Sequence, residues 1–388
     1  MKTFSYHFYS LTMICLLFAA CGGTGNQSKS TSTTASITQK SFGQVDGKEA
    51  TLYTITNSKG ASVSISDFGG IVQSIIVPDK NGKMADVALG FENVNGYKTK
   101  DGYLGAIIGR YGNRIANGKF SLDDKEYTMA TNNGPNHLHG GLSGFNDKIW
   151  KAEKISGDKY QGLKLTYTSA DGEEGYPGKL NVTVTYTWTE DNELKIDYMA
   201  VTDKSTVCNL TNHLYFNLSG DPKKGILNEV MQINATRYTP VDETLIPTGE
   251  LAPVEGTPFD FTKAKTIGQD IKALGGGADG PVGGGYDHNY VIREAPGEMI
   301  LAAVTHNPES GRVMETYTTE PGVQFYTSNF MGGTFKGKDG SSYEKHVGFC
   351  LETQHFPDSP NKPGFPSTRL NPGKTYKTST VYKFSVKK

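Results

Sequence analysis

The segment Leu180-Asn-Val-Thr-Val-Thr-Tyr-Thr-Trp-Thr189 alternates apolar and polar residues without interruption. Successive side chains of a β-strand point to opposite faces, so this pattern predicts a strand with one buried face. The side chains expected in the core are those of Leu180, Val182, Val184, Tyr186 and Trp188. Asp191-Asn192 then favours a turn, and Leu194–Tyr198 alternates again, which predicts a β-hairpin.

Three other segments show the same period of two, namely Leu163–Tyr167, Val63–Ser66 and Val381–Val386. No segment has the spacing of an amphipathic helix, and 47 glycines and 17 prolines supply turns between many strands. Consecutive alternating strands favour antiparallel pairing. The pattern therefore predicts an all-β fold, a large antiparallel β-sandwich that forms a single domain over residues 41–388.

No linker interrupts this body, although a length of about 350 residues could hold two domains. The glycine-rich stretch Gly275–Gly285 leads directly into Tyr286-Asp-His288. A flexible stretch next to such polar residues favours a loop beside a functional site over a domain boundary.

The first 20 residues have the features of a signal peptide, with a basic Lys2 and an apolar run, Leu11–Ala20, that is too short to span a bilayer. Leu17-Phe-Ala-Ala-Cys21 resembles a bacterial lipobox, which implies cleavage before Cys21 and lipidation of its thiol. A plain signal peptide with a chance cysteine is the alternative. Residues 21–40 are rich in Ser, Thr and Gly and predict a flexible tether. We therefore expect an exported protein, lipid-anchored to the bacterial cell envelope on its periplasmic side or at the cell surface.

Charge and cysteine content exclude few classes of protein but give two expectations. The 39 Lys and Arg residues balance 40 Asp and Glu residues, so nothing indicates a nucleic-acid partner. Cys208 and Cys350 are the two cysteines of the body, and each lies in an apolar, strand-like context. This context favours free buried thiols over a disulfide, without settling the pairing.

The segment Asn209–Leu218 combines an apolar face with an unusual polar one. Read as a strand, one face carries Leu210, Leu214, Phe216 and Leu218. The other face carries Asn209, Thr211, His213, Tyr215 and Asn217. Exposed strands usually carry Lys, Glu and Thr, so we interpret His213 as lying on the floor of a polar cleft.

His137 and His139 form an H-x-H pair that would share one face of a strand. Such a pair raises the possibility of a metal site, but the expected nearby glutamate is missing from residues 142–145. We therefore expect no metal. His139 precedes Gly140-Gly141, which would let a ligand approach the backbone, so we interpret it as a hydrogen-bond donor. A histidine satisfied inside the core is the alternative.

Three more polar side chains occur at positions where neither an ordinary core residue nor an ordinary surface residue is expected. Asp287 follows the glycine-rich stretch, and a carboxylate there could accept from two vicinal sugar hydroxyls, although a turn aspartate is equally compatible. Gln324 shares one face of Pro321–Thr327 with Tyr326. Glu352 ends an apolar strand, where burial would raise its pKa from about 4.3 toward neutrality and suit a general base. An exposed glutamate is the alternative.

Seven segments together resemble aldose 1-epimerase, a family also called galactose mutarotase. They are Gly109–Ile115, Asn136–Gly141, Asp171–Gly178, Asn209–Leu218, Gly285–Asn289, Pro321–Thr327 and Leu351–Gln354. They occur in that family's order and cover the body from about Phe42 to Phe384. The resemblance implies a β-supersandwich, in agreement with the strand pattern.

The resemblance also implies roles for matching residues. Glu352 matches the base that takes the proton of the anomeric hydroxyl, and His213 matches the acid that protonates the ring oxygen as the C1–O5 bond opens. The open aldehyde then recloses through its other face, so no cofactor or metal is needed. We expect the two groups to face each other across a space one pyranose wide. The substrate would be a free aldohexose such as galactose or glucose.

Further matching positions imply contacts with the sugar. The expected substrate-holding residues are Arg114, His139, Asp287 and Gln324, with Asn113 and Tyr215 as neighbours. Arg114 is preferred over Arg110 because the family's functional arginine lies in Asn-Arg-Ile.

Three other functions remain open. A non-catalytic sugar-binding lipoprotein would not need Glu352 and His213 together. A hexose-6-phosphate epimerase would need a basic cluster, of which the motifs supply only Arg110 and Arg114. A glycoside hydrolase would need two carboxylates, and Glu352 and Asp287 are the candidates. The sequence does not specify the preferred aldose, and we expect the protein to be a monomer.

Overall fold

The computed structural model describes residues 1–5, 7, 34–98, 102–274, 283–334 and 336–387. Two units are distinguished along the chain, residues 1–32 and 33–388. In the first unit the described residues form no regular secondary structure. Cys21 and most of the predicted signal peptide and tether lie outside the described residues, as does most of the stretch Gly275–Gly285. Among the described residues, no helix has the length and apolar character needed to cross a bilayer.

The described part of the second unit is built from three large antiparallel sheets and several two-stranded ones. The nine-stranded sheet has the order β11 (Lys151–Gly157), β12 (Tyr160–Ser169), β13 (Leu180–Thr189), β14 (Glu193–Thr202), β27 (Thr375–Val386), β23 (Arg312–Thr318), β22 (Ile300–His306), β17 (Val230–Ile233) and β20 (Lys265–Thr266). One five-stranded sheet contains β1 (Ser36–Val45), β2 (Lys48–Thr56), β3 (Ser62–Ser66), β4 (Val72–Pro78) and β5 (Met84–Asp86). The other has the order β19 (Ala252–Pro253), β18 (Arg237–Tyr238), β21 (Asp287–Val291), β24 (Gly322–Tyr326) and β25 (Cys350–Gln354).

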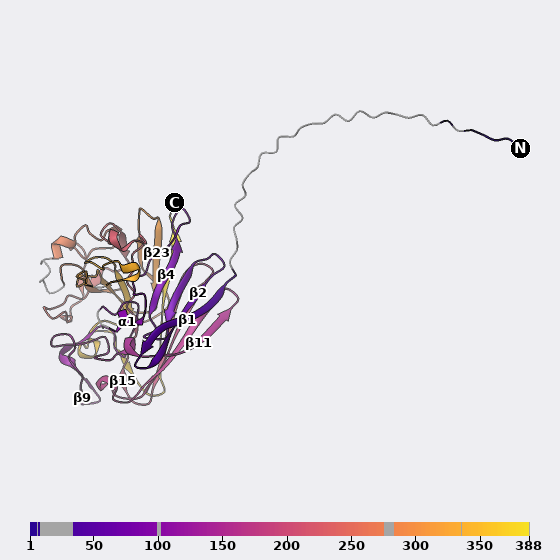
Figure 1. Ribbon diagram of the computed structural model, residues 1–388. Coiled ribbons are helices and arrows are strands. Elements are labelled where there is room, and N and C mark those ends of the chain that lie inside the picture. The colour runs from indigo at the N-terminus through magenta and orange to yellow at the C-terminus, as the bar shows by residue number, and fades with distance from the viewer. Residues whose placement is uncertain (6, 8–33, 99–101, 275–282, 335, 388) are drawn as a thin grey trace. The chain divides into compact units, whose positions relative to one another are not determined.

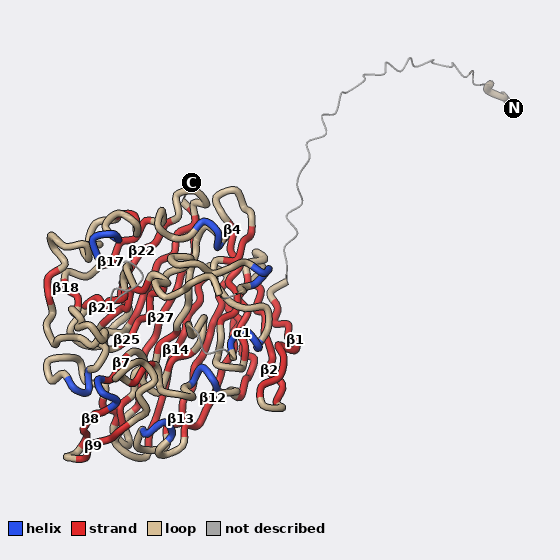
Figure 2. The backbone as a smooth tube through the Cα atoms, turned by 60° about the vertical axis from the view of Figure 1, so that its left-hand side comes forward, coloured by secondary structure: helices blue, strands red, loops and turns tan. Residues whose placement is uncertain are grey.

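Short elements complete the second unit. The two-stranded sheets are β6 (Ile107–Ile108) with β16 (Thr211–Asn212), β7 (Arg114–Ile115) with β10 (His137–Leu138), β8 (Lys119–Leu122) with β9 (Lys125–Thr128), and β15 (Thr206–Val207) with β26 (Arg369–Leu370). The α-helix is α1 (Val94–Tyr97). The 3-10 helices are Ala116–Gly118, Phe145–Asp147, Glu173–Gly175, Pro222–Lys224, Ile271–Leu274, Lys338–Gly340 and Ser359–Asn361. Strands dominate the tube in Figure 2, where the helices are single short turns.

One hydrophobic core joins all three large sheets. Val182 and Tyr186 of the nine-stranded sheet lie in the same buried cluster as Val63 of β3 and Phe325 of β24. Labelled strands β1, β2 and β4 of one five-stranded sheet and β11 and β23 of the nine-stranded sheet can be followed in Figure 1. This shared core makes the fold a sandwich, because one large sheet buries a face against two smaller ones.

The predicted hairpin and its buried face are confirmed. The strand β13 pairs with β14 in antiparallel register, and the five side chains expected in the core are each at most 2% exposed. The three other segments with period two are also strands, within β12, β3 and β27. Both body cysteines, Cys208 and Cys350, are buried and free, as favoured above.

Two expectations about chain boundaries and strands are wrong. The predicted tether reaches residue 40, but β1 already begins at Ser36, because this polar edge strand pairs along its length with β2. The segment Asn209–Leu218 is not a continuous strand, and only β16 and isolated bridges at Asn209 and Phe216 lie within it. Its apolar residues Leu210, Leu214, Phe216 and Leu218 still enter the main core.

The backbone at His213 is fixed by the neighbouring β6 segment. The N–H of His213 donates to Ala106 O (3.0 Å), and the N–H of Gly105 donates to His213 O (2.8 Å). Gly105 has φ +69°, and a Cβ there would lie 2.3 Å from Val72 O, so only glycine fits. These hydrogen bonds continue the β6–β16 pairing beyond its last paired residues and fix the backbone of the histidine.

The Tyr186 hydroxyl connects the core to this region, and its removal tests that connection. It donates to Gly70 O (2.7 Å) and accepts from Asn212 Nδ2 (3.3 Å), next to His213. Tyr186→Phe leaves buried polar groups without this partner, so we expect the free energy of unfolding to fall by about 1–3 kcal/mol in urea titrations. Tyr160→Phe, at a 38% exposed tyrosine of β12, is the control. A change in the Tyr186 variant no larger than in the control would contradict this account.

Candidate active site

A cavity of about 510 Å³ opens beside β21, β25 and the β7–β10 pair. Its buried wall carries Asn113, Arg114, His139, His213, Tyr215, Asp287 and Glu352. These residues come from distant parts of the chain. The cavity therefore collects nearly all of the polar residues that the sequence singled out.

His213 and Glu352 lie side by side in this wall. His213 Nε2 is 3.6 Å from Glu352 Oε1, and both side chains are almost completely buried. On its other side, His213 Nδ1 is 3.5 Å from the Sγ of Cys350. The distance to Glu352 is shorter than a pyranose is wide, so the expectation that the two groups face each other across the whole sugar is wrong.

Burial sets the protonation of this pair. It raises the pKa of the Glu352 carboxyl well above its ordinary 4.5, the Asp287 carboxylate raises it further, and Arg114 opposes the shift. Burial lowers the pKa of His213 to about 3. Removal from water disfavours both charges, so burial favours the form of the pair with a protonated carboxyl group and a neutral imidazole.

His139 is held by a reciprocal pair of hydrogen bonds with Asn113. The N–H of Asn113 donates to His139 Nδ1 (3.1 Å), and the N–H of His139 donates to Asn113 O (3.1 Å). Both residues adopt left-handed backbone, with φ of 64° and 51°. Since Nδ1 accepts, the proton of the neutral imidazole lies on Nε2, which makes His139 a hydrogen-bond donor.

The hydrogen bond at His139 Nδ1 also affects whether these residues could bind a metal ion. His139, His213 and Glu352 bring one possible ligand atom each within 4.8 Å of one another. A histidine that binds a metal usually donates through its other nitrogen, whereas His139 accepts there. The donor set therefore fits a three-ligand metal site poorly, and the expectation of no metal stays a prediction.

Asp287 is hydrogen-bonded by Gln324 and is subject to the positive charge of Arg114. Gln324 Nε2 donates to Asp287 Oδ1 (2.7 Å). Burial raises the pKa of Asp287, while Arg114 and Gln324 oppose that rise. Arg114 itself donates through Nε to Asn133 Oδ1 (3.0 Å). The positive charge of the arginine thus favours the ionised form of both buried carboxyl groups, Asp287 and Glu352.

Three sequence expectations change in the structure. Gln324 does not belong to the cavity wall but lies behind Asp287, so its contact with a ligand would be indirect. His137 does not share a face with His139, because the left-handed backbone at His139 breaks the strand period. His137 instead bonds the Tyr176 hydroxyl through Nε2 (2.7 Å). The missing side chain of Gly140 leaves room for the protein's own backbone and not for a ligand, since a Cβ there would lie 1.9 Å from Gly109 O.

The chain resembles known proteins in both sequence and fold. Residues 51–383 match the family model for aldose 1-epimerase. The chain belongs to the aldose 1-epimerase family. The galactose mutarotase of Rattus norvegicus is 45% identical over 352 residues, covering 90% of this chain and 99% of that protein. The aldose 1-epimerase of Escherichia coli K12 is 37% identical over 341 residues, covering 87% and 96%.

Solved structures agree with this membership. The GalM/aldose epimerase homologue from C. elegans aligns with a TM-score of 0.79 at 30% identity, covering 87% of this chain and 99% of that one. Galactose 1-epimerase from Lactobacillus acidophilus NCFM also has a TM-score of 0.79, at 26% identity, and covers 92% and 100%. The resemblance and the supersandwich fold expected from the sequence are therefore confirmed.

In this family member, several cavity residues had no individual role in the sequence interpretation. The Tyr103 ring packs edge-on against His139 with a centroid distance of 4.7 Å. Tyr326 packs edge-on against His213 at 6.1 Å, and the 55% exposed Phe330 lies at the rim with Glu243. Alternation along β24 had placed Tyr326 on one face with Gln324, but without a role of its own. The loops that carry Tyr103, Glu243 and Phe330 have no such pattern.

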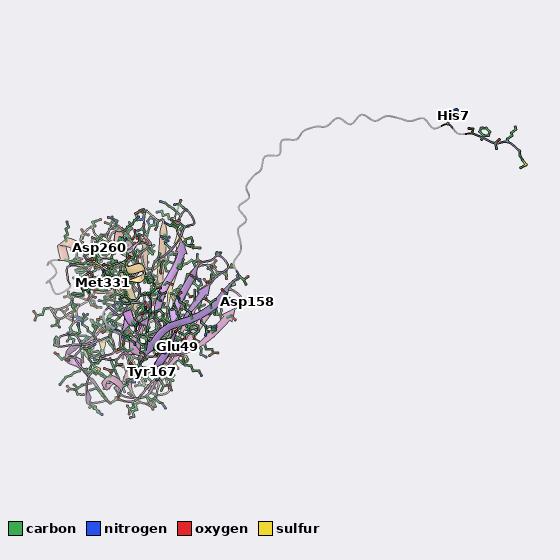
Figure 3. The ribbon with its side chains drawn as sticks, in the orientation of Figure 1. His7, Glu49, Asp158, Tyr167, Asp260 and Met331 are labelled. Atoms are coloured by element: carbon green, nitrogen blue, oxygen red, sulfur yellow. The ribbon has the colours of Figure 1, made fainter. Side chains whose placement is uncertain are left out.

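The segment Asp171–Gly178, one of the seven that resemble the family, lies outside the cavity and hydrogen-bonds the loop that follows His139. Glu174 accepts from the N–H groups of Leu142 (2.8 Å) and Ser143 (3.1 Å), just after the His139 loop. Arg110 donates to the carbonyls of Pro177 and Gly178, which explains why Arg114, and not Arg110, is on the cavity wall. Tyr167, labelled in Figure 3, donates to the adjacent Glu173 (2.7 Å).

Proposed function

We propose that this protein is an aldose 1-epimerase that interconverts the α and β anomers of free aldohexoses such as galactose and glucose. The observation that supports it most is the buried Glu352–His213 pair, 3.6 Å apart on the wall of a cavity of about 510 Å³ that can hold a monosaccharide. The anomeric hydroxyl oxygen O1 and the ring oxygen O5 are bonded to the same carbon. A base and an acid this close together can therefore reach both oxygens at once.

Ring opening needs only two proton transfers. Glu352, as carboxylate, takes the proton from O1 while His213 Nε2–H protonates O5, the C1–O5 bond breaks and C1=O1 forms. Rotation about C1–C2 presents the other face of the aldehyde. O5 then attacks C1 and returns its proton to His213, and Glu352 returns the first proton to O1. Both groups recover their starting states, so no cofactor is consumed.

Sugar binding supplies the charges that this reaction needs. Burial favours the protonated carboxyl group of Glu352 and the neutral imidazole of His213. Hydroxyl groups that donate to Glu352 favour its ionised form, as Arg114 already does, and the proton can then move to His213. His139 donates through Nε2, and Asp287 accepts from sugar hydroxyls. Binding of the sugar thus favours Glu352 as the base and His213 as the acid.

The charge of the cavity favours a neutral sugar over a phosphorylated one. Arg114 is the only Lys or Arg among the described lining residues, which also include the acids Glu243, Asp287 and Glu352. A phosphate group usually requires several cationic or backbone N–H donors. A hexose-6-phosphate epimerase therefore fits the cavity less well than an enzyme acting on free aldoses.

Removal of either reacting group tests the mechanism. We expect Glu352→Gln and His213→Asn each to lower kcat by about 10²-fold or more, because each abolishes one proton transfer. The rate is followed by polarimetry of freshly dissolved α-galactose or α-glucose, after subtraction of the spontaneous reaction. Glu315→Gln and His306→Asn, on the nine-stranded sheet and outside the cavity, are the matched controls.

Two outcomes would contradict the proposal. If the wild-type protein accelerates no common aldose but still binds one, it is a sugar-binding protein. If Glu352→Gln turns over at nearly the wild-type rate, the base has been assigned to the wrong residue.

The pH profile gives a second test. The active free enzyme carries one proton on the pair, so activity requires a pH above the second protonation and below the loss of the last proton. With the pKa of His213 lowered to about 3 and that of Glu352 raised, we expect the acid limb of kcat/KM to lie far below the ordinary histidine value and the alkaline limb to lie above the ordinary glutamate value. An acid limb with a midpoint near the ordinary histidine value of 6.5 would contradict these shifts.

We further propose that the protein is exported and lipid-anchored through Cys21, on the strength of the lipobox-like sequence Leu17–Cys21 and the polar segment that follows it. In a bacterial host we expect wild-type protein to incorporate radiolabelled palmitate and to sediment with membranes. Cys21→Ser should remove both properties. Unlabelled wild-type protein, released in soluble form, would indicate a plain signal peptide.

A further inference from the structure

One strand face contacts both nitrogens of the His213 imidazole. Cys350 and Glu352 are two positions apart on β25, so their side chains point to the same side of the strand. Cys350 Sγ lies 3.5 Å from Nδ1, and Glu352 Oε1 lies 3.6 Å from Nε2. The imidazole therefore bridges from one side chain of β25 to the next.

Other neighbours of His213 pack against the ring. Tyr215 stacks on it at a centroid distance of 4.9 Å, and His139 lies edge-on at 5.2 Å. The carbonyl of His213 itself favours a proton on the ring. Among the described side chains, Cys350 is the hydrogen-bonding partner found at Nδ1.

A neutral thiol can serve this position in two ways. It is a weak donor and a weak acceptor, so it can bond Nδ1 whether or not that nitrogen carries a proton. Cys350 is completely buried, and burial raises the pKa of its thiol well above 9.0, with Glu352 and Asp287 adding to the rise. The sulfur therefore remains protonated while the imidazole changes charge.

A thiol also differs from the carboxylate that often orients a catalytic histidine. A carboxylate at Nδ1 stabilises the imidazolium ion and so weakens it as an acid. A neutral sulfur stabilises that ion much less. His213 beside Cys350 is consequently a stronger acid toward a weakly basic ring oxygen.

We propose that Cys350 is a positioning residue of the epimerase reaction, which holds the His213 ring through Nδ1 so that Nε2 faces the sugar in both proton states. When the imidazolium gives its Nε2 proton to O5, the product is the neutral Nδ1–H tautomer, which donates to Sγ. When the sugar ring recloses, Nε2 takes the proton back. No proton passes through the sulfur. The kinetic part of this inference rests on the function proposed above.

Three variants separate positioning from packing. Cys350→Ala removes the hydrogen bond, so we expect kcat to fall about 3- to 10-fold with KM within about twofold of wild type. Cys350→Ser keeps a donor and an acceptor and should restore kcat to within about twofold. Cys208→Ala removes an equally buried thiol that belongs to the main hydrophobic core, in a different cluster from Cys350, and it should leave kcat unchanged.

A spectroscopic measurement tests the same contact without relying on activity. The ¹⁵N chemical shifts of the His213 ring, assigned by comparison with His213→Asn, report which nitrogen carries the proton. We expect Cys350→Ala to change the Nδ1 shift and Cys208→Ala to leave it at the wild-type value. This readout holds even if the protein proves not to be an epimerase.

Clear results would overturn the proposal. One is a Cys350→Ala variant with wild-type kcat and unchanged ¹⁵N shifts. Another is an equal loss of kcat in Cys350→Ala, Cys350→Ser and Cys208→Ala, which would show that only packing had been disturbed.

Discussion

The removal of Glu352 and His213 from water is the constraint on which the site depends. Two ionisable groups 3.6 Å apart would form an ordinary ion pair at a surface, but here burial disfavours both charges. The result is a pair for which burial favours the neutral carboxyl group and the neutral imidazole, so a polar ligand that stabilises the carboxylate shifts the balance between the two groups. Arg114 limits the cost by favouring the carboxylate, without neutralising the pair completely.

The fold brings these groups together by strand register and by local departures from it. Adjacent strands β24 and β25 place Gln324 opposite Glu352, and β21 places Asp287 within reach of Gln324. The other wall of the cavity depends on left-handed backbone at Asn113 and His139. Regular sheets therefore fix the carboxyl groups, whereas irregular segments fix the donors.

This division explains what could be predicted from the sequence. Alternation along residues 180–189 predicted a strand whose buried face is the observed one, because a period of two has few other structural solutions. The same alternation, applied to β25, gives Cys350 and Glu352 a common face because they are two residues apart. It failed for His137 and His139, since a single residue with positive φ reverses the faces and leaves no trace in an apolar–polar pattern. The aromatic wall contributed by Tyr103 and Phe330 depends on long-range loop packing, which local sequence does not encode.

Burial of the Glu352 carboxyl group costs stability, which indicates that this residue serves a function other than packing. Its neighbours Phe349 and Leu351 fill the core, and an apolar residue at position 352 would avoid the cost of a buried carboxyl group. Instead Glu352 is 2% exposed, and within the described residues its Oε2 has no hydrogen-bond partner. Gln324 Oε1, on the neighbouring strand, also has no hydrogen-bond partner among the described residues. A protein that maximised stability would not retain an acceptor in this state. Hydroxyl groups of a bound sugar could satisfy Glu352 directly, and the free energy lost in folding would then be recovered in binding and in proton transfer.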